Sequence, residues 1–93
     1  MIEITDWAAE LLLRSYQSAR RFDPHATVRL QRASDGVEFV LTDERVAGDE
    51  VVRGDGFELL VEAGLEGTID VLEPHDRLIL RPAGDTERSV RPD

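Results

Sequence analysis

The sequence predicts an α+β fold in which an N-terminal helix packs on a compact β sandwich or pseudo-barrel of mainly antiparallel or mixed strands. Two observations support this prediction. Apolar residues recur at helical spacing in the first quarter of the chain, and beyond Pro24 they alternate with polar residues as in strands. The strand patterns follow one another closely without helices between them, which argues against a parallel sheet built from crossover units.

The segment ITDWAAELLLRSYQSARRF is expected to form one amphipathic helix, from about Thr5 to Phe22. Thr5 or Asp6 can cap its N-terminus, because a side-chain oxygen there accepts a hydrogen bond from a free N–H of the first turn. Pro24 disfavours helical geometry at Asp23 and therefore ends the helix. The apolar stripe consists of Ala8, Leu11, Leu12, Tyr16 and Ala19.

Five or six short strands are expected after Pro24. In each pattern one face is apolar and should point into a core, and clusters of Gly, Asp, Ser and Pro between the patterns predict turns. The clearest patterns cover residues 27–32, 37–42, 57–61, 68–72 and 77–82. The residues expected to be mostly buried are Val28, Leu30, Val37, Phe39, Leu41, Phe57, Leu59, Val61, Ile69 and Val71.

With 93 residues the chain has room for one small domain, which we place at residues 1–82. Residues 83–93 are polar and poor in apolar side chains, so we expect a disordered tail. Because so small a domain buries little apolar surface by itself, dimerisation would help it, and a homodimer is an open alternative.

The charge balance is acidic, with 20 acidic residues against 11 basic ones and a net charge of −9. This balance opposes binding to nucleic acid or anionic membranes, because phosphate contacts need a concentrated positive face. No apolar run approaches the ~20 residues needed to cross a bilayer. The N-terminus also lacks the basic and then apolar pattern of a secretory signal, so a cytoplasmic protein is expected.

The order of these segments resembles the HesB-like, A-type iron–sulfur carrier family. ITDWAAELL is similar to that family's capping Ser or Thr followed by an Ala-Ala helix. VRLQRASDGVEFVLTDE resembles its central strand–loop–strand, in which Gly-Cys-Ser-Gly precedes the second strand. GDEVVRGDGFELLVE resembles the hairpin that follows, and GTIDVL the next strand. The similarity runs from about Ile2 to Pro82 and implies a HesB-like fold.

The metal ligands of that family are missing from this chain. Its carriers hold iron or a cluster through a loop cysteine and a Cys-x-Cys pair near the C-terminus. Here Ser34 stands at the position that resembles the first of these cysteines, and the chain contains no cysteine. Iron–sulfur clusters require soft thiolate ligands, and a serine hydroxyl does not replace them. The family's helix before the last matched strand is also shortened to EAGLEG, which allows one turn at most.

We therefore expect a cluster-incompetent, HesB-like protein without enzymatic activity, which needs no cofactor and acts as a binding or regulatory module. A protein partner is expected, and family analogy alone suggests the iron–sulfur assembly machinery. Trp7, in the first helical turn, is the candidate partner contact, because Trp is enriched at interface hot spots. Packing in the core or at a dimer interface is the alternative use of its ring.

Two other functions remain open. The first is a small metal-dependent hydrolase that uses His25, His75 and nearby carboxylates such as Asp76. The pattern is weak evidence for metal, because zinc sites usually need three or four converging ligands. Ser34 also lacks the Gly-x-Ser-x-Gly context of a nucleophile and is better explained as a turn residue. The second alternative is a purely structural domain.

The absence of thiols gives a direct test. Anaerobic reconstitution of the purified protein with iron and sulfide should leave it colourless, and the Ser34→Cys variant should stay colourless too, because the C-terminal pair is also missing. The measurement is visible absorbance after desalting. A stoichiometric cluster that survives desalting would contradict this expectation.

Overall fold

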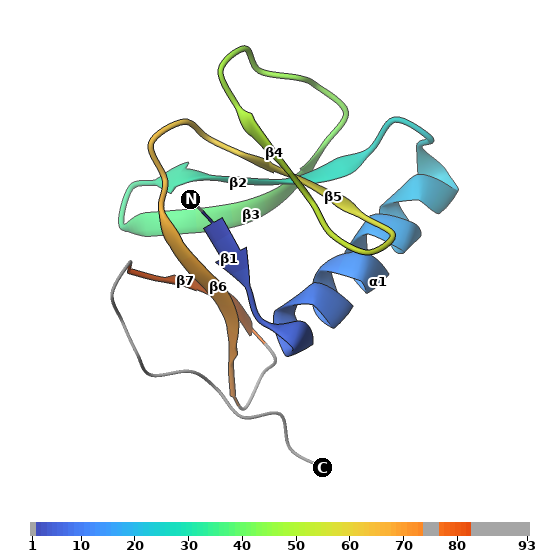
Figure 1. Ribbon diagram of the computed structural model, residues 1–93. Coiled ribbons are helices and arrows are strands. Elements are labelled where there is room, and N and C mark those ends of the chain that lie inside the picture. Colours follow the sequence, from blue (N-terminus) through green and yellow to red (C-terminus); the bar gives the residue numbers. More distant parts are fainter. Residues whose placement is uncertain (1, 74–76, 83–93) are drawn as a thin grey trace.

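The computed structural model describes residues 2–73 and 77–82 and shows one helix and two β-sheets (Figure 1). The predicted tail, residues 83–93, lies outside the described residues. In chain order the elements are β1 (Ile2–Ile4), α1 (Asp6–Phe22), β2 (Thr27–Ala33), β3 (Gly36–Thr42), β4 (Glu50–Arg53), β5 (Glu58–Val61), β6 (Gly67–Leu72) and β7 (Arg77–Arg81).

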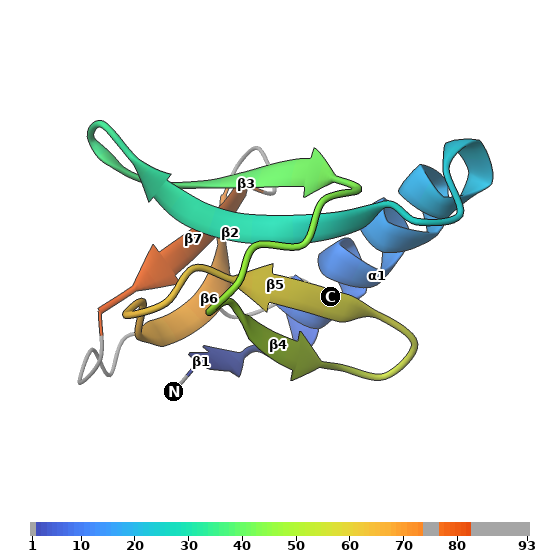
Figure 2. The same cartoon turned by 90° about the horizontal axis from the view of Figure 1, so that it is seen from above.

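Both sheets are mixed, as the sequence predicts. The three-stranded sheet has the order β1-β6-β7, with β1 parallel and β7 antiparallel to β6. The four-stranded sheet has the order β3-β2-β5-β4, in which β2 and β5 are parallel and the outer pairs antiparallel. Figure 2 shows these four strands one after another from top to bottom. The α+β prediction is confirmed, and β1 is a strand that the sequence reading missed.

Helix α1 begins and ends where the sequence indicates. Thr5 is its N-cap, and the Thr5 hydroxyl oxygen accepts a hydrogen bond from the backbone N–H of Ala8 at 3.2 Å. At the other end Asp23 is extended, with φ −142° and ψ 114°, as expected of a residue before a proline. The connection between β5 and β6 contains turns and no helix, which agrees with the shortness of EAGLEG.

The core lies where α1 faces both sheets. Leu12 of α1, Leu30 of β2 and Ile69 of β6 are at most 1% exposed and belong to one cluster of packed side chains. Seven of the ten residues predicted to be in the core are buried, and two, Val37 and Phe39, are half-buried.

The prediction is wrong for Leu41, whose side chain is 62% exposed. Leu41 does alternate in phase with Phe39, but β3 is the edge strand of its sheet. At this end of β3 an open cleft separates the strand from α1. Alternation therefore predicted correctly that Leu41 lies on the same face of β3 as Phe39. Because β3 lies at the edge of its sheet, that face is uncovered at Leu41.

A carboxylate is buried in the middle of β6. Asp70 is completely buried and accepts hydrogen bonds from the Thr5 hydroxyl at 3.1 Å, from the backbone N–H of Val71 at 2.8 Å and from Nε of Arg81 at 3.0 Å. A buried charge is tolerated only when it is paired and hydrogen-bonded. These partners come from the start of α1, from β6 and from β7, so Asp70 connects all three.

Nearby, β6 starts at a position that only glycine fits. Gly67 has φ of +133°, and a Cβ placed on it would collide with the carbonyl oxygen of Arg81 in β7. Both the backbone conformation and the close approach of the neighbouring strand therefore require glycine.

Removing the Thr5 hydroxyl should weaken the fold. Thr5→Val keeps the shape of the side chain but removes both the helix cap and the donor to Asp70, so we expect a loss of about 1–3 kcal/mol of stability. Thr5→Ser keeps the hydroxyl and serves as the control. Urea denaturation compares the two variants. Equal stability of Thr5→Val and Thr5→Ser would contradict a role for the hydroxyl.

Candidate binding cleft

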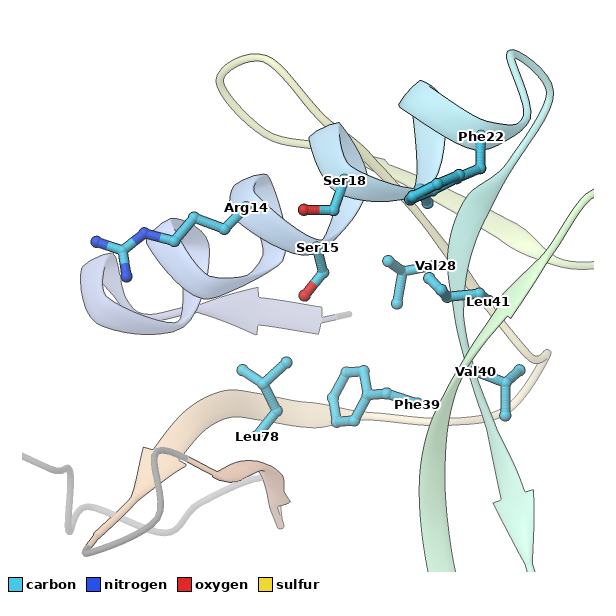
Figure 3. Close-up of a pocket in the computed structure, with 10 residues that line it drawn as sticks. Arg14, Ser15, Ser18, Phe22, Val28, Phe39, Val40, Leu41 and Leu78 are labelled. Atoms are coloured by element: carbon cyan, nitrogen blue, oxygen red, sulfur yellow. The ribbon is translucent and has the colours of Figure 1, made fainter.

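A cleft with mainly apolar walls lies between the second half of α1 and the edge strand β3 (Figure 3). The helix side carries the small residues Ser15, Ser18 and Ala19, which leave space above the strand. Phe39 of β3 and Leu78 of β7 line the opposite side. The cavity has a volume of about 480 Å³. This size lies within the ~300–1,000 Å³ of typical ligand sites.

Large apolar side chains at one end of this cleft are unusually exposed. Phe22 is 92% exposed and Leu41 is 62% exposed, the two highest values for large hydrophobic residues in the described part of the chain. Both line the cleft, together with buried Val28. Single exposed hydrophobic residues are common on protein surfaces, but adjacent ones around a concave site are typical of binding surfaces.

The cleft continues along α1 into a more polar hollow of about 500 Å³. The two spaces share Arg14, Ser15, Phe39 and Leu78, and we call them together the α1–β3 groove. The polar hollow adds Leu11, Val37, Glu38 and Arg77. Of its charged residues, Glu38 accepts a hydrogen bond from Gln31 at 2.8 Å. The groove is therefore apolar at the Phe22 end and charged at the Arg14 end.

An ion pair joins β2 to the connection between β3 and β4. Nε of Arg29 is 2.8 Å from Oδ2 of Asp49, and Nη2 of Arg29 is 2.9 Å from Oδ1, which gives a bidentate pair. The hydrogen bond with Asp49 raises the pKa of Arg29. The hydrogen bond with Arg29 lowers the pKa of Asp49, against the opposing effect of desolvation. Asp49 ends the connection from β3 to β4, so the pair fixes that connection to β2.

The sequence-predicted site residues do not form a site among the described residues. Ser34 is exposed in the two-residue turn between β2 and β3. Gly36, the next residue but one, has φ of +148°, so the turn requires glycine there. His25 is exposed, and its backbone N–H donates to Asp23 at 2.9 Å. His75 and Asp76 lie outside the described residues.

Metal binding finds no geometric support in residues 2–73 and 77–82, which contain no group of three or more His, Asp or Glu side chains placed to hold an ion. Trp7 is half-buried and packs against the core cluster. Within the same part of the chain, no helix has the length and hydropathy to cross a membrane.

Sequence reasoning missed the exposed apolar residues of the groove and the ion pairs that join strands and loops. Phe22 is the last residue of α1 and follows Ala19 at helical spacing, so periodicity gives no signal that its ring is exposed. Leu41 carries no such signal, because its position in the pattern is that of a core residue. The contacts Arg29–Asp49 and Asp70–Arg81 join separate strands and loops, and charged residues occur too often in this chain for spacing to identify the pairs.

The chain matches no protein-family model, no curated protein and no solved structure. The functional argument therefore depends on the geometry of the groove and on the residues of the chain itself.

The ion pair of Asp49 predicts a dependence of stability on pH. A carboxyl group with a lowered pKa stabilises the folded state above its ordinary pKa of about 3.9 and loses this effect as the pH falls through the folded-state value. Asp49→Asn should therefore melt several degrees below the parent protein at pH 7, and the difference should shrink below about pH 4. Thermal melts between pH 7 and pH 2 measure it.

The control for this test is Asp43→Asn, which changes an exposed acidic residue in the same connection. It should melt with the parent protein at pH 7. A difference between parent and Asp49→Asn that stayed constant down to pH 2 would show that the ionised carboxylate is not the stabilising group.

Proposed function

We propose that this chain is a binding module without chemistry of its own, which holds an apolar group of its ligand in the cleft between α1 and β3. The observation that carries the proposal is the exposure of Phe22 and Leu41 at the same concave site. Exposed apolar surface of this kind is unfavourable in water, and occupation of the cleft by an apolar group would remove it from solvent.

The resemblance to the A-type carriers supports a module rather than a carrier. The resemblance rests on the order of sequence segments, and the thiolate ligands that the carriers of that family need are absent, which favours a binding module over a cluster carrier. Iron–sulfur assembly is the cellular context that this resemblance suggests, by analogy alone. The analogy does not identify a ligand, whereas the groove has a shape and a charge pattern from which one can be inferred.

A light-activated crosslinker placed at the rim of the cleft tests this function in cells. Phe22→p-azidophenylalanine keeps the aromatic ring at its exposed position. After irradiation we expect a discrete added mass on this variant, whether the bound species is a small molecule or a protein, because a bound group would lie beside the ring. Intact-mass measurement after purification detects the adduct.

Gln17→p-azidophenylalanine is the matched control, because Gln17 is exposed on the same helix and does not line the cleft. It should give no specific adduct. If Phe22 and Gln17 variants both stayed unmodified, or carried the same heterogeneous adducts, the cleft would not be a binding site.

A further inference from the structure

The α1–β3 groove has one end built from hydrocarbon. In Figure 3 the ring of Phe22 lies at one end of the space below α1, Val28 and Leu41 lie beside it, and the side chains of Phe39 and Leu78 face the helix from the other side. The polar side chains that line this cleft are those of Ser15, Ser18 and Arg14, and Arg14 also lines the polar hollow, so the Phe22 end is mainly apolar. It therefore suits an alkyl chain better than a polar one.

The other end of the groove carries cations in an otherwise acidic protein. Most arginines of the described residues are engaged: four form ion pairs with carboxylates and Arg20 donates to the carbonyl of Ala26. Arg14 and Arg77 form no ion pair with another described residue, and both line the polar hollow. The neighbouring Glu38 is hydrogen-bonded to Gln31. With two guanidinium groups and one carboxylate, the hollow keeps a net positive charge, which favours an anion.

The size of the groove favours a small molecule over a protein surface. From Arg14 to Phe22 the helix rises only about 12 Å. Ten residues line the apolar end, and the polar hollow adds four. A standard protein interface uses ~20–30 residues on each side. Fewer residues line the groove than form such an interface. The length of the groove and its single charged end match a linear molecule with one polar group.

We propose that the groove binds a free medium-chain carboxylic acid, with the alkyl chain between Phe22, Leu41 and Phe39 and the carboxylate beside Arg14 and Arg77. The planar guanidinium group of arginine matches a carboxylate with two parallel hydrogen bonds. The hydroxyl of Ser15 lies where the two ends of the groove meet. This inference rests on the proposed function and names the ligand class of the same cleft.

Calorimetric titration with alkyl probes below their micelle concentration tests the proposal. Decanoate should bind more tightly than octanoate, by about fourfold for each added CH₂ while the apolar end still has room. Decanoate should also bind at least fivefold more tightly than decanol, because only the carboxylate can form charged hydrogen bonds with arginine. Decyltrimethylammonium, with the opposite charge, should bind more weakly than decanol.

Two variants separate the contributions of charge and hydrocarbon. Arg14→Gln should lower the affinity for decanoate at least fivefold and leave decanol unchanged, whereas Arg45→Gln, an exposed arginine outside the groove, should change neither. Leu41→Asp should weaken both probes. Because Leu41 is 62% exposed, this variant should keep its fold, and a thermal melt checks that it does.

The outcomes distinguish this inference from the function on which it rests. Equal affinities for decanoate and decanol, or an unchanged decanoate affinity in Arg14→Gln, would overturn the carboxylic acid proposal. Binding to phosphatidylglycerol vesicles without binding to free decanoate would overturn it as well, in favour of a membrane lipid. In each case a specific adduct on the Phe22→p-azidophenylalanine variant would still support the binding module. The absence of such an adduct would contradict both the binding module and the carboxylic acid proposal.

Discussion

The buried carboxylate of Asp70 is the interaction on which the arrangement of the helix and the three-stranded sheet depends. Its oxygens lie in the fully buried middle of β6, where a charge without partners would be strongly unfavourable. Thr5 and Arg81 must therefore remain within hydrogen-bonding distance of it. Thr5 caps α1 with the same oxygen, so one hydroxyl both begins the helix and fixes its N-terminus to β6.

This anchoring explains why the groove opens at the far end of α1. The first turns of the helix are held to β6 through Thr5 and pack on the core through Ala8 and Leu12, which are buried. Further along, Ser15 and Ser18 replace the large apolar residues that would fill the space beside β3. Within residues 2–73 and 77–82, β3 is an edge strand and its apolar face is left exposed at Leu41. The cavity thus follows from small residues on the helix and from the position of β3.

Local sequence patterns predicted the helix and most of the strands because their causes are local. The cap at Thr5, the apolar stripe and Pro24 define α1 within one segment, and alternation defines β2, β3, β5 and β6. The same reasoning failed where the cause is distant in sequence. β1 is a three-residue strand that exists through its parallel pairing with β6, and three residues are too few to show a period. The exposure of Leu41 depends on strand order, which alternation does not encode.

For the candidate site too, the sequence predicted the features with local causes and missed those that depend on the fold. The turn around Ser34 and Gly36 was recognised because Ser, Asp and Gly together indicate turns, and the φ of Gly36 agrees with this. The groove was not recognised, because its lining comes from α1, β2, β3 and β7, and only the fold brings these together. Conversely, the pattern around His25 drew attention to an exposed residue that belongs to no metal-binding group among the described residues, and His75 lies outside them.

The apolar end of the groove is also distant from the position that the resemblance to the A-type carriers singles out, Ser34. Ser34 lies in the turn before β3, whereas Leu41 lies near the other end of this strand, five residues or about 17 Å beyond Gly36. The position that the resemblance assigns to a metal ligand is therefore remote from the apolar end of the groove. Ser34 does not line the cleft beside Phe22 and Leu41. Binding in the groove thus requires neither a cysteine nor the side chain at position 34.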